Sequence, residues 1–209
     1  MRSYGQYCAL AKALDVVGDR WTLLIVRELA VRGASRYTDL RNGLPGIATN
    51  MLADRLREME EAGIVRREEA PPPVATTLFS LTARGEELMP VLFALGRWGV
   101  ALMGERGDDE FRGYWLKYPL ENLFADGSPD EPPVTLELRT GDAPVVVETV
   151  DGAIRVHSGT ADHPDAVVSG DPEVVLGVLR GSVDLRTAKR HGLRVEGDTD
   201  ALARVQPRG

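Results

Sequence analysis

The chain has 209 residues, of which 43% are apolar and 27% are charged, a composition typical of a soluble globular protein with one large domain or two small ones. Its single cysteine excludes an internal disulfide framework, and we expect neither a signal peptide nor a membrane-spanning segment, so the expected location is the cytoplasm. The net charge of −7 is uneven: residues 1–107 carry 14 Lys and Arg against 13 Asp and Glu, and residues 108–209 carry 11 against 19. Residues 20–67 carry nine against six, a net charge of +3.

Four helices are predicted in the first third of the chain. Helical periodicity favours helices over Cys8–Val17, Trp21–Ala30 and Tyr37–Asn42, and an amphipathic helix over Thr49–Ala62 that Gly63 ends. In this last helix the apolar side chains share one face, which leaves the opposite face available for a partner.

Two strands follow the amphipathic helix and form a hairpin. Val65–Glu69 and Thr76–Leu81 read as the strands, and the three prolines within Ala70–Ala75 make a protruding tip, because proline cannot donate a ladder hydrogen bond. Helix, turn, helix and hairpin is the order of a winged helix-turn-helix, in which the second helix enters the major groove of DNA and the hairpin reaches the flanking backbone. The residues expected to contact double-stranded DNA are Arg36, Thr49, Asn50, Ala53, Asp54, Arg57, Arg66 and Arg67.

Several motifs in this half carry a family resemblance. Gly18–Trp21, Pro45–Ile47 and Met51–Val65 resemble the HxlR family of bacterial winged-helix regulators, which are related to the MarR group. The resemblance implies a DNA-binding homodimer. The family usually has a serine where this chain has Ala48, so we expect Thr49 to cap the recognition helix instead, which shortens that helix by one residue.

A long apolar helix is predicted after the hairpin. Thr82 is placed to cap it, it runs to about Glu105, and Pro90 inside it predicts a bend or a late start. Such a helix has more apolar surface than a small domain can cover, which favours a homodimer interface; the alternative is that it packs on the first helix of its own chain. The residues expected at the dimer interface are Leu10, Leu88, Leu92, Leu95, Trp98 and Leu102.

The second half has a different pattern, and we place the domain boundary between residues 107 and 108. An aromatic segment, Phe111–Phe124, reads as a helix that joins the two halves, and beyond it the apolar period changes from helical spacing to two. The predicted elements are a strand at Val134–Arg139, a hairpin of Val145–Val150 and Ala153–Ser158, a strand at Ala166–Ser169, helices at Asp171–Arg180 and Leu185–His191, a last strand at Leu193–Glu196, and a final helix from Asp198.

This half resembles the sterol-carrier-protein-2-like (SCP2-like) fold in Val168–Pro172, Leu179–Gly181 and Gly192–Asp198. The resemblance implies helices packed on a sheet around an apolar tunnel, so the expected fold class is α+β: a winged helix-turn-helix at residues 1–107 and an SCP2-like α/β domain at residues 108–209. The second domain is either a structural spacer or a binding domain for an apolar small-molecule effector. The residues expected to line such a pocket are Leu136, Val146, Ile154, Val156, Val168, Leu176 and Leu179.

No motif calls for catalysis. The three histidines lie far apart, and neither a metal-ligand cluster nor a nucleotide-binding loop occurs, so we expect no enzymatic activity, no cofactor and no metal. Cys8 lies where many HxlR-family proteins carry a cysteine that senses oxidants or electrophiles, and Lys12 favours its thiolate if both face solvent. The alternative is that Cys8 is a buried small apolar residue.

The overall interpretation is a homodimeric transcription factor that binds an inverted-repeat operator, with repression favoured over activation. The alternative is a carrier of lipid-like small molecules whose winged helix mediates protein interaction.

Overall fold

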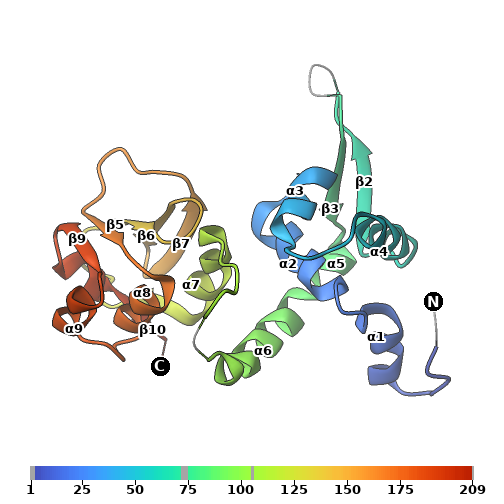
Figure 1. Cartoon of the computed structure of the whole chain (residues 1–209), viewed down its shortest axis with the longest axis horizontal. Coiled ribbons are helices and arrows are strands. Elements are labelled where there is room, and N and C mark those ends of the chain that lie inside the picture. The colour runs from blue at the N-terminus through green and yellow to red at the C-terminus, as the bar shows by residue number, and fades with distance from the viewer. Residues whose placement is uncertain (1–2, 72–74, 105, 209) are drawn as a thin grey trace. The chain divides into compact units, whose positions relative to one another are not determined.

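The computed structural model describes residues 3–71, 75–104 and 106–208 (Figure 1). Contacts divide the chain into two compact units, Met1–Gly104 and Glu105–Gly209, so the division falls three residues before the expected boundary. Within the described residues no helix is both long enough and apolar enough to cross a bilayer.

The N-terminal unit consists of helices around a small antiparallel sheet whose strand order is β1-β3-β2. Its buried cluster combines Ile25 and Leu29 with Leu40 and with Leu52 and Leu56. The elements are α1 (Ala9–Val17), α2 (Thr22–Arg32), β1 (Ser35–Arg36), α3 (Tyr37–Gly43), α4 (Thr49–Glu61), β2 (Val65–Glu69), β3 (Thr77–Leu81), α5 (Ala83–Glu86), α6 (Met89–Gly99) and a 3₁₀ turn η1 (Val100–Leu102).

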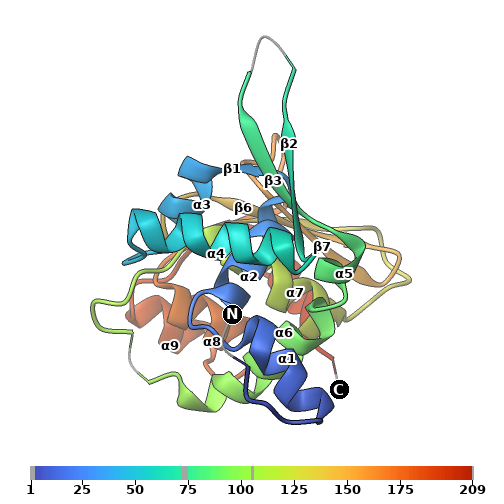
Figure 2. The same cartoon turned by 90° about the vertical axis from the view of Figure 1, so that its right-hand side faces the viewer.

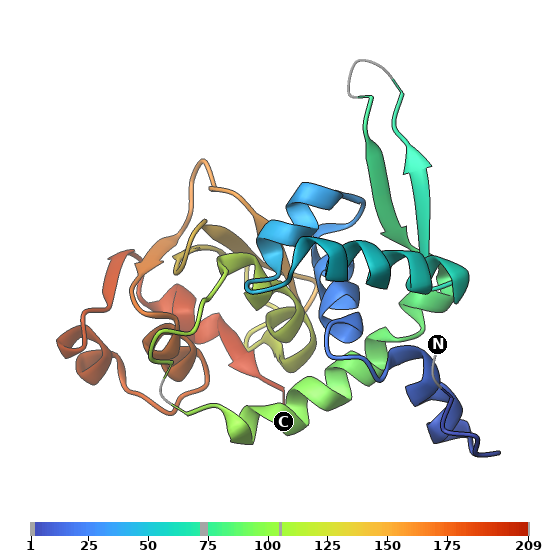
Figure 3. The same ribbon diagram turned by 45° about the vertical axis from the view of Figure 1, so that its right-hand side comes forward.

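Helix α4 follows from its sequence pattern. Leu52, Leu56 and Met59 recur at helical spacing and all three are buried, and Gly63 follows in the left-handed conformation that commonly ends a helix. Figures 2 and 3 show α4 at the base of the long hairpin, with α3 beside it. The tip predicted between the two strands includes residues 72–74, which lie outside the described residues.

The expected capping of α4 by Thr49 is wrong. Thr49 is the first helical residue, and Ala48, in an extended conformation, is the N-cap residue without a side-chain cap. The carbonyl of Ala48 accepts from the N–H of Leu52 at 3.0 Å, and Ile47 is buried in the core just before it. Core packing therefore decides where the chain enters the helix, and local capping preference does not.

The single helix expected from Thr82 to about Glu105 is also wrong. Thr82 does cap a helix, its hydroxyl accepting from the N–H of Gly85 at 3.1 Å, but α5 ends at Glu86. A new helix, α6, starts at Met89 with Pro90 in its first turn, where the missing proline N–H costs nothing. The late start that Pro90 predicted is confirmed, and the helix ends at Gly99.

The C-terminal unit is built on a five-stranded mixed sheet of order β7-β6-β5-β8-β9, in which only β5 and β8 run parallel. Its elements are η2 (Gly113–Leu116), α7 (Lys117–Leu123), β4 (Phe124–Asp126), β5 (Thr135–Arg139), β6 (Val145–Val150), β7 (Ala153–Ser158), β8 (Ala166–Ser169), α8 (Pro172–Leu179), α9 (Leu185–Arg190), β9 (Arg194–Gly197), η3 (Asp200–Arg204) and β10 (Val205–Pro207). Both hairpin strands and β8 have the predicted bounds.

The two ends of this unit differ from expectation. The aromatic segment is a 3₁₀ turn followed by the short helix α7, and the chain leaves it as strand β4 at Phe124. The predicted final helix is the 3₁₀ turn η3, and a further strand, β10, pairs with β4. Arg204 reinforces this pairing: its Nε and Nη2 donate to Asp126 Oδ1 and Oδ2 at 2.7 and 2.8 Å.

Candidate nucleic-acid interface

The outer face of α4 gathers the residues that the sequence pattern placed there. Thr49, Asn50, Ala53, Asp54 and Arg57 are all exposed, whereas the other face of the helix is buried in the core. Because an α-helix repeats every 3.6 residues, these five positions lie on one side of it. A partner that approaches the unit at α4 therefore meets all five side chains.

Helices α3 and α4 are joined at their N-termini. The hydroxyl of Tyr37 donates to the carbonyl oxygen of Thr49 at 2.5 Å. At the same end of α3, Asp39 Oδ2 accepts from the backbone N–H of Arg36 at 3.2 Å, and the Arg36 side chain is exposed. Leu40 and Leu44, in α3 and directly after it, are buried in the core of the unit. These contacts set the angle at which α4 is presented.

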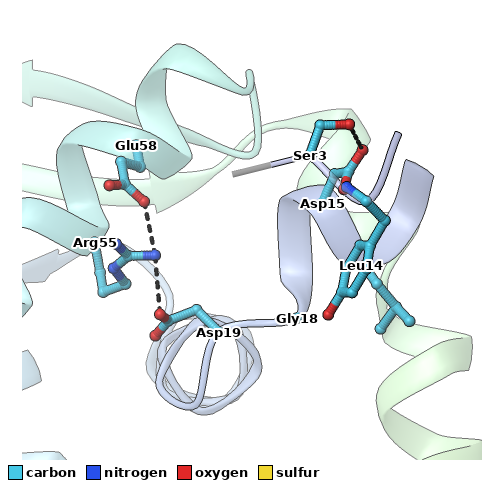
Figure 4. Close-up of a pocket in the computed structure, with 8 residues that line it drawn as sticks. Ser3, Leu14, Asp15, Gly18, Asp19, Arg55 and Glu58 are labelled. Carbon is cyan, nitrogen blue, oxygen red and sulfur yellow. Dashed lines mark hydrogen bonds and ion pairs between the residues drawn. The ribbon is translucent and has the colours of Figure 1, made fainter. Parts of the chain in front are cut away.

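The two arginines of α4 have different environments. Arg57 Nη2 pairs with Asp54 Oδ1 at 3.0 Å, and both side chains are more than half exposed, so water screens the pair and little free energy opposes its exchange for another partner. Arg55 points to the other side, where its Nη1 lies 2.7 Å from Glu58 and 3.3 Å from Asp19 (Figure 4). Arg57 is thus available to a ligand, and Arg55 holds α4 to the turn after α1.

The hairpin places its two arginines on opposite faces, because successive residues of a strand alternate. Arg67 pairs with Phe79, which packs on the core cluster that includes α4. Arg66 pairs with Ser80 on the other face, where its Nε donates to Ser80 Oγ at 3.0 Å and lies 3.1 Å from Glu68. A duplex lying against α4 and one face of the hairpin therefore does not meet both arginines equally.

The six residues expected at a dimer interface fall into two groups. Leu88 and Leu92 are partly buried against the unit's own core, where α6 contacts α2, whereas the intramolecular alternative named the first helix. Leu10, Leu95, Trp98 and Leu102 are 48 to 69% exposed. Further large apolar side chains, outside these six, are exposed nearby in the chain: Tyr4, Tyr7, Leu14, Val91, Val100 and Met103.

Cys8 is free and exposed at the start of α1, so the alternative of a buried apolar residue is wrong for the single chain. Its carbonyl accepts from the N–H of Lys12 at 2.9 Å. The Lys12 ammonium group, however, lies 3.6 Å from Asp15 Oδ2 and is engaged there. The cation expected beside Cys8 therefore pairs with Asp15.

A cavity of about 610 Å³ lies between the N-terminal segment, α1 and α4 (Figure 4). Asp15 accepts from the N–H of Tyr4 at 2.7 Å and from the hydroxyl of Ser3 at 2.8 Å, and these two bonds, the backbone bond foremost, lower the pKa of Asp15. Sequence reasoning missed this cavity because its walls come from segments that are distant in the chain. The lining residues are Ser3, Tyr4, Leu14, Asp15, Gly18, Asp19, Arg55 and Glu58.

In the C-terminal unit the strand register divides the expected pocket residues. Leu136, Val156 and Val168 share one face of the sheet, and Ile154 belongs to the same face of β7. Val146 pairs with Glu137 and therefore lies on the opposite face, so its assignment to the same pocket is wrong. Six of the seven expected pocket residues are buried, and Leu176 is half-buried. Leu176 and Leu179 lie on α8, whereas the other five lie on strands.

The opposite face of that sheet holds a buried carboxylate. Burial would raise the pKa of Glu137, but the N–H of Ala161, at 3.0 Å, and the guanidinium of Arg139, at 2.6 Å, outweigh it, and the pKa is lowered. Glu137 thereby holds the loop after β7 onto the sheet. Among the described residues no group of three or more His, Cys, Asp or Glu side chains is arranged to hold a metal ion.

Comparison with known proteins gives matches that cover up to about half of the chain. A family model described as HxlR-like helix-turn-helix matches residues 16–106. The chain is 38% identical over 95 residues, 46% of its length, to an uncharacterized HTH-type transcriptional regulator of Synechocystis sp., sll1512, and covers 70% of that protein. It is 34% identical over 87 residues to the similarly described YvaP of Bacillus subtilis, and covers 80% of it. Among solved structures, the reduced form of the transcriptional regulator YodB from B. subtilis matches 49% of this chain and all of its own, with 31% identity and a TM-score of 0.41.

Proposed function

This chain belongs to the HxlR-like helix-turn-helix family, and from that premise we propose that it is a DNA-binding transcriptional regulator, a repressor that holds an inverted-repeat operator as a homodimer. The observation that carries the proposal is the exposed face of α4, with its core face buried and its start tied to α3. A helix presented in this way fits the major groove.

The proposed base contacts are made by Asn50 and Arg57. An arginine reads guanine and an asparagine reads adenine through paired hydrogen bonds at the major-groove edge. Asp54 keeps the Arg57 guanidinium over the helix face until a base replaces it. Arg36 and Arg67 are proposed to contact phosphate, and of the two hairpin arginines we favour Arg67, because it shares the hairpin face that packs on the α4 core cluster.

The proposed dimer contact is the exposed apolar surface of α1, α6 and η1. Trp98, Leu95 and Leu102 on the last two elements, with Leu10 on α1, leave an apolar area that a monomer in water seldom exposes. A two-fold dimer presents two copies of α4, and its operator is then an inverted repeat with half-sites about one helical turn apart.

Cys8 lies beside this surface in sequence, and we propose it as a redox-sensing residue. Cys8→Ser should bind DNA as the wild type does, but it should keep its affinity in peroxide, because a serine hydroxyl cannot be oxidised to a sulfenic acid or a disulfide. Gel shifts with and without peroxide make the comparison. Equal release of both proteins from DNA would oppose the assignment.

For the C-terminal unit we propose an effector-binding domain of SCP2-like fold. Two observations support this proposal. Leu136, Ile154, Val156 and Val168 form an apolar face of the mixed sheet, and this sheet and its helices belong to one compact unit. An apolar small molecule bound there regulates only if the DNA-bound and free arrangements differ in affinity for it. A thermal-shift screen of the full chain tests this: an apolar ligand should raise the unfolding temperature and weaken DNA binding together.

The experiment that tests DNA recognition is selection of bound duplexes from a random pool by the full chain. We expect an inverted repeat to be enriched, and Arg57→Ala to lose roughly 1–3 kcal/mol of binding free energy at one base position and to relax preference there. Arg84→Ala, an exposed arginine on α5, is the matched control and should select the same repeat with unchanged affinity. If the wild type enriches no sequence, the proposal is wrong and the carrier function gains support.

A further inference from the structure

A short basic segment stands out in the acidic C-terminal unit. Residues 105–209 carry 12 Lys and Arg against 20 Asp and Glu, a net charge of −8. Within them, residues 180–194 carry five cations and one carboxylate, Asp184, a net charge of +4. The five cations, all exposed, are Arg180, Arg186, Lys189, Arg190 and Arg194, and we call them the basic segment.

None of these five side chains has a salt-bridge partner among the described residues. Several other arginines of the unit, in contrast, pair with carboxylates: Arg106 pairs with Asp171 at 3.2 Å, and Arg204 pairs with Asp126 at 2.7 Å. Arg112 and Arg139 have carboxylate partners as well. The basic segment is therefore a place where positive charge accumulates with little internal compensation.

The segment is concentrated on α9. Arg186, Lys189 and Arg190 are three and four residues apart, so they share one side of this helix. Arg180 caps the end of α8, which contacts α9, and Figure 1 shows the two helices side by side. Arg194 begins β9, directly after the turn that follows α9. The cations thus come from three consecutive elements of the unit, α8, α9 and β9.

Helix electrostatics explain only part of this arrangement. Lys189 and Arg190 are in the last turn of α9 and Arg180 is at the end of α8, where a cation is favourable beside the free carbonyl groups. Arg186, however, is in the first turn of α9, where a cation opposes the helix dipole. Arg194 is on an edge strand, where a charge discourages strand pairing with another chain. Neither reason calls for four exposed arginines and a lysine together.

We propose that the basic segment binds the phosphate backbone of double-stranded DNA outside the stretch held by the winged helix. The inference rests on the proposed DNA-binding function, which brings a long polyanion to the same chain. Arginine and lysine contact phosphate without reading sequence. Because the rest of the unit is acidic and would be repelled, and charges act over only about 8 Å at physiological ionic strength, the basic segment is the part of the unit that can approach a duplex.

The test compares Arg186→Gln/Lys189→Gln with Lys117→Gln/Arg155→Gln in the full chain. Each double variant removes two cations that have no salt-bridge partner among the described residues, so the change in net charge is the same. Affinity is measured against salt concentration on two duplexes: the selected operator alone, and the operator extended by about two helical turns, roughly 20 base pairs, on each side.

We expect the wild type and the control variant to bind the extended duplex more tightly than the short one. For the basic-segment variant this advantage should disappear. The slope of log affinity against log salt should also fall by about 0.9 for each phosphate that the variant no longer neutralises, which is up to roughly 1.8 for two cations. Equal behaviour of the two variants on the extended duplex would overturn the inference. Failure of the wild type to bind either duplex would instead refute the proposed function.

Discussion

The Tyr37 hydroxyl donates to the Thr49 carbonyl oxygen, so that the first residue of α3 is bonded to the first residue of α4. In the proposed function α4 enters the major groove and α3 supports it. This side-chain bond adds to the core packing that holds the recognition helix, at the point where α4 lacks a side-chain cap.

Removal of that bond should weaken both folding and recognition. Tyr37→Phe keeps the ring and is expected to lower the free energy of unfolding by about 0.5–1.5 kcal/mol, the usual net value of one hydrogen bond, while operator affinity falls as the helix orientation is less well held. Urea unfolding and gel shifts measure the two effects. Tyr7→Phe is the control, because Tyr7 is fully exposed. Unchanged operator affinity in Tyr37→Phe would show that core packing alone orients α4.

The hairpin faces predict unequal roles for two adjacent arginines. Arg67→Ala should weaken binding to all sequences alike and reduce the salt slope by about 0.9, the value of one phosphate contact. Arg66→Ala should have a smaller effect, because Arg66 is on the other face and is engaged by Ser80 and Glu68. Binding titrations at several salt concentrations provide the comparison. A larger loss of affinity for Arg66→Ala would place the duplex against the opposite face of the hairpin.

The exposed apolar surface predicts a change in assembly. Trp98→Asp places a charge where a second copy should bury an indole, and light scattering should report monomers with weakened operator binding. Ala203→Asp, at an exposed position of the C-terminal unit, adds the same charge elsewhere and should leave the dimer intact. A dimeric Trp98→Asp protein would locate the interface on another surface.

The ion pair between Asp126 and Arg204 predicts a pH dependence of stability. The hydrogen bond from Arg204 is the main cause that lowers the pKa of Asp126 in the folded chain. A carboxyl group whose folded pKa is lowered stabilises the fold above its unfolded pKa, near 3.9, and that stabilisation is lost as pH falls from about 5 through the folded value. Arg204→Met should therefore be less stable at neutral pH and lose less stability on acidification. Urea midpoints between about pH 3 and pH 7 measure this, and parallel curves for the two proteins would contradict it.

Much of the local structure is readable from the sequence alone. The buried face of α4, the hairpin about Asp151 and Gly152, and the start of α8 at Pro172 all follow from spacing, turn residues and caps within a few positions. These signals are short in range, because helix periodicity, proline geometry and left-handed glycine act on neighbouring residues. The outward face of α4 follows from the same period, so most of the candidate DNA-contacting side chains could be named in advance.

Other features were decided only by contacts between distant segments. Strand β10 exists because Val205 pairs with Asp126, and local pattern carries no information about a partner so far along the chain. The start of α4 at Ala48 depends on packing around Ile47, and the side on which Val146 lies depends on its register with Glu137. The sequence by itself therefore determined which elements form and which faces are apolar, whereas tertiary structure decided which faces meet, because pairing register and packing join residues whose separation in sequence leaves no local trace.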